Sequence, residues 1–377
     1  MAVEIAGQAH GRAKRDPALG LVDCDVHPWP TADQLATYLS PRWRSYQETF
    51  GLRGPTGRGT LQMRPFSARM DAWPPDGGFP GSNPDFAREQ LLDKYDISHA
   101  ILNSPPGLFP TWTGGNHPRE YSADMMKALN DWIRVEWLDR DPRWLGSVCV
   151  TYEQPEVAAQ EIARCREADG RFVQVMLPVR MHSPAGNRVY EPMIEAMVHY
   201  GLPMGIHVGG DGLNPVTGAG YPTYFYENHT GFTQAAFSHI ASLIFEGTFD
   251  RWPDLKVVMM ETNWSWLAPF SWRLDACWRV LREEVPHLER KPSEYLADHL
   301  WVTSQPAEEF ENPLWFRSVY EQFKTTGVAA NFMFATDYPH WDFDSPEEAL
   351  PTTLSQAELD NILWGTANRL YGLSRFE

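Results

Sequence analysis

Short apolar runs alternate with longer amphipathic segments along this chain, and this alternation restricts the possible fold more than any other feature. The apolar runs have the length and composition of buried parallel strands. They are Leu21–Val26, His99–Asn103, Leu145–Val150, Phe172–Leu177, Pro203–Val208, Lys256–Met260, His299–Thr303 and Phe332–Thr336. The segments between them carry apolar residues three to four positions apart, as helices packed on a sheet do. They are Asp85–Tyr95, Tyr121–Leu138, Val157–Glu167, Glu191–Tyr200, Gln234–Phe245, Trp266–Glu284, Glu308–Phe323 and Gln356–Leu363. This order predicts an α/β fold.

Eight strand–helix units in series favour a closed (β/α)₈ barrel over an open sheet. A barrel leaves no strand edge exposed and brings every loop that follows a strand to one rim. An open doubly wound sheet usually carries a glycine-rich phosphate turn after its first strand, and none follows Leu21–Val26. We therefore predict one barrel domain over residues 20–377. Residues 1–19 have no apolar signal-peptide core, and we expect them to form a flexible arm.

Two long insertions, residues 39–84 after the first strand and residues 209–233 after the fifth, interrupt the alternation. Both would emerge at the rim where such barrels carry their chemistry. Loops of this length without secondary structure are usually lids or binding loops. We expect them to cover a substrate, with a purely structural or subunit-contact role as the alternative.

The charge balance limits the partners of the chain. Its 32 basic and 49 acidic residues give a net charge of −17. Nucleic acids and anionic membrane surfaces both need a basic face, so neither is an expected partner. No apolar run is long enough to cross a membrane. The cysteines are few and widely spaced and form no CxxC pair, which predicts reduced thiols and a cytoplasmic location. They are Cys24, Cys149, Cys165 and Cys277.

The first predicted strand ends in the sequence DCDVH, which places an acid and an imidazole at the rim. Side chains alternate along a strand, so Asp25 and His27 project together from its C-terminal end while Asp23 lies lower. A carboxylate and an imidazole in this arrangement form half of a site for a divalent cation. The DxH pattern alone is common; its position at a strand end makes it informative.

Two further strand ends supply the other half. His207 ends the fifth predicted strand, and Asp337 follows the eighth. In a closed barrel the first and eighth strands are neighbours and the fifth lies across the mouth. Each residue alone is more often a hydrogen-bonded polar group or a helix cap. Together Asp25, His27, His207 and Asp337 predict one bound divalent metal, with zinc as the first expectation and manganese as the alternative.

Several phrases resemble those of the amidohydrolase-2 family, which is related to aminocarboxymuconate-semialdehyde decarboxylase and to aromatic acid decarboxylases. The resemblance extends over about residues 20–373. Its phrases are Asp25–His27, Leu202–Gly209, Trp252–Val258, Thr336–His340 and Ile362–Leu373. It implies a distorted TIM barrel with long insertions after strands 1 and 5, and one metal held by Asp25, His27, His207 and Asp337. Many members carry a histidine after the sixth strand, where this chain has Glu261, and a glutamate lacks the neutral hydrogen-bond donor that a histidine provides.

The function expected first is that of a metal-dependent hydrolase. In that interpretation Asp337 takes the proton of a metal-activated water, and Glu261 or His340 is the second proton-handling group. The alternative is a metal-dependent non-oxidative decarboxylase of an aromatic or unsaturated acid, because several relatives act in this way and the same ligands serve both reactions. A non-catalytic barrel is the third interpretation.

Aromatic residues in the predicted loops favour a small flat or cyclic organic substrate. They are Trp112, Tyr224, Phe225, Trp264, Trp266 and Trp341. Relatives often form homodimers, and the tryptophan-rich helix of residues 266–278 could supply such a contact. Apolar residues at helical spacing more commonly belong to the core, so the sequence leaves the oligomeric state open.

Overall fold

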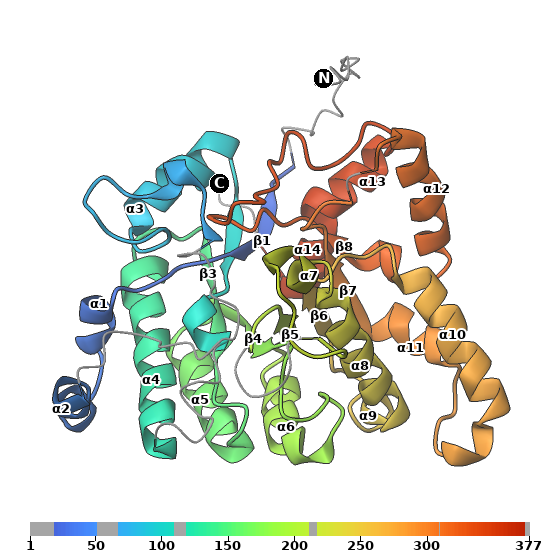
Figure 1. Ribbon diagram of the computed structural model, residues 1–377, viewed down its shortest axis with the longest axis horizontal. Coiled ribbons are helices and arrows are strands. Elements are labelled where there is room, and N and C mark those ends of the chain that lie inside the picture. The colour runs from blue at the N-terminus through green and yellow to red at the C-terminus, as the bar shows by residue number, and fades with distance from the viewer. Residues whose placement is uncertain (1–18, 51–66, 109–117, 211–216, 309, 374–377) are drawn as a thin grey trace.

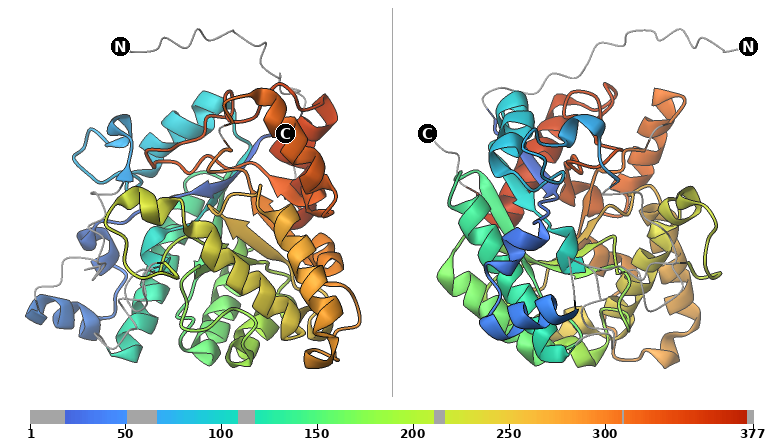
Figure 2. Two further views of the ribbon diagram at one scale, coloured as in Figure 1. Left: turned by 45° about the vertical axis from the view of Figure 1, so that its right-hand side comes forward. Right: turned by 60° about the vertical axis from the view of Figure 1, so that its left-hand side comes forward.

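The computed structural model describes residues 19–50, 67–108, 118–210, 217–308 and 310–373. Eight parallel strands pair in sequence order, each with the next. They are β1 (Val22–Val26), β2 (His99–Leu102), β3 (Trp144–Cys149), β4 (Phe172–Pro178), β5 (Met204–His207), β6 (Val257–Met260), β7 (Leu300–Thr303) and β8 (Phe332–Met333). Figures 1 and 2 show the helices arranged around these strands. The predicted TIM barrel is confirmed.

The barrel closes between β8 and β1 through single backbone contacts instead of a regular ladder. Cys24 N donates to Phe334 O at 3.0 Å, and His27 N donates to Tyr338 O at 2.8 Å. The predicted strand Phe332–Thr336 is wrong in its second half. The N–H of Ala335 donates to the hydroxyl of Ser304, and the N–H of Thr336 donates to the carboxylate of Asp23, so side chains replace the backbone partners of a regular ladder. This irregular seam accounts for the distortion of the barrel.

Most helices match the predicted segments. Those of the barrel layer are α3 (Pro84–Ala87, continuing as π-helical turns over Arg88–Asp93), α4 (Arg119–Trp132, continuing likewise over Ile133–Leu138), α5 (Pro155–Ala168), α6 (Glu191–His199), α8 (Phe232–Phe245), α9 (Thr248–Arg251), α10 (Leu267–Val280), α11 (Pro292–His299), α12 (Pro313–Lys324), α13 (Gln356–Asp360) and α14 (Thr366–Tyr371). The short α9, α11 and α14 were not predicted. The predicted helix Glu308–Phe323 begins later than expected, because the Asn312 side chain caps its first turn and accepts from Leu314 N.

The insertions contain helices of their own, which the sequence analysis did not expect. The first holds α2 (Pro41–Phe50) and follows α1 (Ala32–Ala36), and the second holds α7 (Phe225–His229). A reciprocal capping box starts α1: Gln34 N donates to the Thr31 hydroxyl, and Thr31 N donates to Gln34 Oε1 at 2.7 Å. This T-x-x-Q pattern was readable from the sequence.

The barrel interior combines a polar network with apolar packing. Gln174 on β4 donates to Ser147 Oγ on β3 at 2.8 Å and to Asn103 Oδ1 after β2 at 2.9 Å. Met260 on β6 and Met333 on β8 belong to one buried apolar cluster, and the sulfur of Met260 contacts the side-chain amides of both Asn103 and Gln174. The polar network therefore provides hydrogen bonds beneath the rim at β2–β4, and the apolar side chains fill the remaining space.

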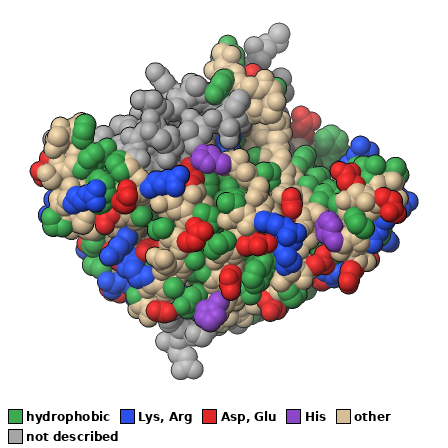
Figure 3. All heavy atoms as spheres, turned by 90° about the horizontal axis from the view of Figure 1, so that it is seen from below, with side chains coloured by type: hydrophobic (Ala, Val, Ile, Leu, Met, Phe, Trp, Pro, Cys, Tyr) green, Lys and Arg blue, Asp and Glu red, His purple; other side chains and the backbone are tan. Residues whose placement is uncertain are grey.

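The described part of the chain contains no helix long and apolar enough to span a bilayer. Acidic and basic side chains are interspersed over the face that Figure 3 shows.

Candidate metal centre and substrate pocket

The four predicted donors meet at the C-terminal ends of the strands. All four are buried, with at most 2% of each residue exposed. His27 Nε2 lies 2.6 Å from Asp337 Oδ1 and 3.4 Å from Asp25 Oδ1. His207 Nε2 lies 3.0 Å from Asp25 Oδ2, and the two imidazole rings lie 4.9 Å apart. We call Asp25, His27, His207 and Asp337 the donor cluster.

Both imidazoles of the donor cluster are oriented by backbone carbonyls. His27 Nδ1 donates to Asn103 O at 2.7 Å, and His207 Nδ1 donates to Val208 O at 2.7 Å. A carbonyl oxygen can only accept, so each Nδ1 carries a hydrogen and each Nε2 turns toward the carboxylates. His27 Nε2 is buried and close to Asp337, yet the angle does not satisfy a hydrogen bond. Asp25, His27 and His207 each place a donor atom within 4.8 Å of the others, and His27 and Asp337 do so together with His340. Nitrogen and carboxylate atoms grouped in this way fit a divalent cation.

The buried carboxylates of the cluster also need positive charge nearby to stabilise them. Burial lowers the pKa of an imidazole, but the negative charges of Asp25 and Asp337 overcome this and raise the pKa of His27 to about 9. Burial raises the pKa of Asp337, but the charge of His340 and the contact with His27 outweigh it, and the pKa lies below its usual value. The buried carboxylates are therefore stabilised by protonated imidazoles or by a metal ion in their place.

Glu261 follows β6, with its Oε2 3.5 Å from His207 Nε2. Burial, and then the negative charge of Asp337, raise the pKa of Glu261 well above its usual value. This rise favours the protonated carboxyl, a form that can donate a hydrogen bond. The Glu261 backbone has a φ of 56° and that of Asp337 a φ of 62°. This left-handed conformation is costly for residues other than glycine and is typical of functional sites.

His340 lies beside the donor cluster. Its Nδ1 is 2.6 Å from Asp337 Oδ1, and its ring stacks on that of His27 with centroids 4.5 Å apart. His340 also lines the pocket, so the structure favours a role that faces the substrate. It is a further possible donor beside His27 and Asp337.

Two amide side chains that the sequence analysis missed hold the carboxylates of the cluster. Asn103 Nδ2, after β2, donates to Asp25 Oδ1 at 2.8 Å. Gln305 Nε2, after β7, donates to Asp337 Oδ2 at 3.0 Å. Both follow strand ends, as the charged donors do.

Asp23 lies outside the cluster, as its lower position on the strand predicted. Its carboxylate accepts from Thr336 N at 2.9 Å and from Thr336 Oγ1 at 2.5 Å. These bonds join β1 to the segment after β8. Burial raises the pKa of Asp23 to about 7, even though the bonds from Thr336 oppose the rise.

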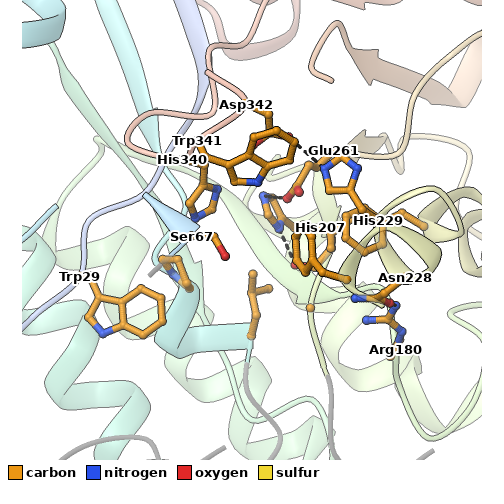
Figure 4. A pocket seen from close by; sticks show the side chains of 16 residues that line it. Trp29, Ser67, Arg180, His207, Asn228, His229, Glu261, His340, Trp341 and Asp342 are labelled. Carbon is orange, nitrogen blue, oxygen red and sulfur yellow. Dashed lines mark hydrogen bonds and ion pairs between the residues drawn. The ribbon is translucent and has the colours of Figure 1, made fainter. Parts of the chain in front are cut away.

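A pocket that is lined by His207 of the donor cluster contains about 660 Å³ of empty space, a figure that includes its open mouth. Figure 4 shows His207, Glu261 and His340 near its centre. Five of its large apolar side chains are called here the pocket wall: Trp29, Leu108, Phe225, Phe232 and Trp341.

The predicted aromatic residues divide into two groups. Phe225 and Trp341 line the pocket. Trp264 does not, because its ring is buried in the core against Phe316 and Phe323. Tyr224 and Trp266 are absent from the lining as well, and Trp112 lies outside the described residues.

The sequence model of the amidohydrolase family matches residues 22–373. The chain belongs to this family. It is 23% identical over 309 residues to gamma-resorcylate decarboxylase from Polaromonas sp. strain JS666, covering 76% of this chain and 87% of the relative. It is 24% identical over 308 residues to 2-amino-3-carboxymuconate-6-semialdehyde decarboxylase from Dictyostelium discoideum, covering 77% of each.

Solved structures show the same fold. One is a dihydroxybenzoic acid decarboxylase from Polaromonas sp. JS666 with bound manganese and the inhibitor 2-nitroresorcinol. It superimposes with a TM-score of 0.63 at 19% identity, covering 95% of this chain and 98% of that chain. The three relatives are named for decarboxylation, the alternative of the sequence analysis, and none for hydrolysis.

Proposed function

We propose that this chain is a metal-dependent carboxy-lyase that removes CO₂ from a small aromatic or unsaturated carboxylic acid. The observation that carries the proposal is the likeness, over 76% and 77% of the chain, to decarboxylases of such acids. A pocket with aromatic walls that also reaches His207, Glu261 and His340 supports it, because a flat acid can place its ring against the wall and its carboxylate at the cluster.

We assign one divalent cation to Asp25, His27, His207 and Asp337. Bound there, it would supply positive charge for a substrate carboxylate and a neighbouring oxygen. Imidazole and carboxylate ligands suit both zinc and manganese. A similar structure holds manganese, so we take Mn²⁺ as the first ion to test and Zn²⁺ as the second.

The residues of this chain would then handle one proton. In decarboxylation the bond to the carboxylate carbon breaks, the electron pair remains on the substrate, CO₂ leaves, and the substrate carbon takes a proton. Glu261 is our candidate donor, because it is buried and lines the pocket. His340 reaches the pocket and contacts Asp337 at 2.6 Å, so it can return a proton to the site.

We also propose that the two insertions cover the substrate. Ser67 belongs to the first insertion, and Phe225, Asn228 and Phe232 belong to the second or lie beside it; all four line the pocket. A cover of this kind excludes water from the carbon that must be protonated, and exclusion of water strengthens every charge interaction below it.

The test measures decarboxylation and hydrolysis by protein that has been loaded with Mn²⁺ or Zn²⁺. We expect CO₂ release from hydroxybenzoates such as 2,6-dihydroxybenzoate, with one metal ion per chain by elemental analysis. Asp337→Asn should abolish release, whereas Asp33→Asn, an exposed aspartate on α1, should not. Cleavage of an ester, lactone or amide without CO₂ release would instead support the hydrolase. A chain that binds no metal and turns over neither class would support the non-catalytic barrel.

A further inference from the structure

A tyrosine near the C-terminal end of the chain reaches into the polar network inside the barrel. Tyr371 is the last residue of α14, which packs against β1 and β8 (Figure 1). Its side chain packs against the apolar cluster in the barrel interior, and its hydroxyl donates to Gln174 Oε1 on β4 at 2.9 Å. The family-like tail phrase Ile362–Leu373 therefore contributes a polar group to the interior as well as apolar packing.

Hydrogen bonds lead without a break from this hydroxyl to a member of the donor cluster. Gln174 accepts from Tyr371 through Oε1 and donates through Nε2 to Asn103 Oδ1 at 2.9 Å. Asn103 in turn donates through Nδ2 to Asp25 Oδ1 at 2.8 Å. Each amide thus accepts at one end and donates at the other, and the last acceptor is an ionised carboxylate, which can only accept. We call Tyr371, Gln174 and Asn103 the amide relay.

The order of donors and acceptors in the amide relay is costly to disturb, because Gln174 and Asn103 are fully buried. Among the residues that the structure describes, the Tyr371 hydroxyl is the one donor to Gln174 Oε1. Burial raises the pKa of the Tyr371 phenol well above its ordinary value, so the hydroxyl keeps the proton that it donates. Without this hydroxyl a buried carbonyl oxygen loses its partner, which favours rotation of the Gln174 amide. A rotated amide would turn Oε1 toward Asn103 Oδ1, and two acceptors repel each other.

We propose that Tyr371 is a positioning residue for the metal centre, which acts through Gln174 and Asn103 to hold the carboxylate of Asp25. Asn103 donates to Oδ1 of this carboxylate, and Oδ2 lies 3.0 Å from His207 Nε2, so the rotation of the carboxylate depends on the amide. Hydrogen bonds that orient a metal ligand from behind change the affinity for the metal. The inference rests on the metal assigned under the proposed function, because Asp25 is one of its four ligands.

The test measures the affinity of the protein for Mn²⁺ by calorimetry, so it does not depend on turnover. Tyr371→Phe removes the hydroxyl and keeps the ring. We expect the Kd for Mn²⁺ to rise about fivefold, less than the roughly 10-fold expected where a ligand loses its own partner. Gln174→Met breaks the amide relay at its centre with a side chain of similar size and should weaken binding at least as much. In Asn103→Ala the relay already lacks its last member, so the addition of Tyr371→Phe should cause no further loss.

Tyr295→Phe is the matched control for the loss of a tyrosine hydroxyl. Tyr295 is buried on α11, and its hydroxyl donates to Asp250 Oδ1 at 2.7 Å, outside the amide relay. The Tm of this variant can fall, because it too loses one hydrogen bond, but its Kd for Mn²⁺ should stay within about twofold of the wild type.

Three results would overturn the role of Tyr371 alone. They are an unchanged Kd in Tyr371→Phe, an equal rise of the Kd in Tyr295→Phe, and a further rise when Tyr371→Phe is added to Asn103→Ala. Should Tyr371→Phe fail to fold, Gln174→Met alone and combined with Asn103→Ala gives the same comparison. If the wild type itself binds no Mn²⁺ and no Zn²⁺, the assignment of the metal falls, and the inference falls with it.

Discussion

The donor cluster and the pocket wall are neighbours, but they are built by different means. Every donor is buried and stands at a strand end or just after one, with a hydrogen-bond partner from another strand or its own backbone. In the wall, Trp341 is 46% exposed and packs through ring contacts of 5.7 to 6.4 Å with side chains of α7. The sheet therefore determines the reactive end of the site, whereas loops determine the end that selects the substrate.

The largest effect should follow from removing a donor. His207→Gln replaces an imidazole nitrogen that converges on the cluster with an amide, and we expect the metal to be lost. Activity should fall more than about 100-fold, beyond the 10–100-fold typical of residues that only support a ligand. Elemental analysis and CO₂ release measure the two losses. Retention of a full metal equivalent in this variant would contradict the assignment of His207 to the cluster.

Metal loading should also stabilise the chain, because the four donors converge only when the barrel is folded. At a free metal concentration about 100 times its Kd, binding adds about 2.7 kcal/mol to the free energy of unfolding. We expect a rise in Tm of about 5 °C, reversed by a chelator and absent in His207→Gln. A Tm that does not respond to the metal in the wild type would indicate that the cluster is held together by imidazolium protons alone.

A smaller effect should follow from Asn103→Ala. The backbone carbonyl that orients His27 remains in this variant, but Asp25 loses its hydrogen bond from Asn103 Nδ2. We expect metal affinity to fall about 10-fold, at the low end of the range for supporting residues. Ser147→Ala is the matched control: Ser147 donates to Asn103 Oδ1 and contacts no donor, so its effect should be smaller. If metal affinity falls equally in both variants, the loss comes from disturbing the polar network inside the barrel and not from the hydrogen bond between Asn103 and Asp25.

The same division explains what could be predicted from the sequence. Buried strands show as apolar runs and their ends share one rim, so Asp25, His207 and Asp337 could be placed together before any contact was known. Asn103 and Gln305 stand at equivalent ends, but an uncharged amide gives no chemical signal by itself. The aromatic residues of the loops could not be sorted in this way.

That sorting failed because a loop's path depends on contacts remote in sequence. Trp264 and Trp341 both follow strands, yet Trp264 turns into the core, where Phe332 of β8 lies 5.4 Å from its ring. Trp341 instead turns toward α7, which belongs to the second insertion. Neither direction is encoded in the residues next to the tryptophan.

The smallest effect should come from the pocket wall. Trp341→Ala removes one aromatic side chain of the wall but touches no donor, so we expect KM to rise about fivefold, which corresponds to roughly 1 kcal/mol of lost ring contact. Metal content and kcat should remain within about twofold of the wild type. Tyr224→Ala is the matched control, since Tyr224 is 69% exposed and does not line the pocket, and it should leave KM unchanged. A fall in kcat or in metal content with Trp341→Ala would show that the loops help to hold the donor cluster. The sheet would then not determine the reactive end of the site independently of the loops that select the substrate.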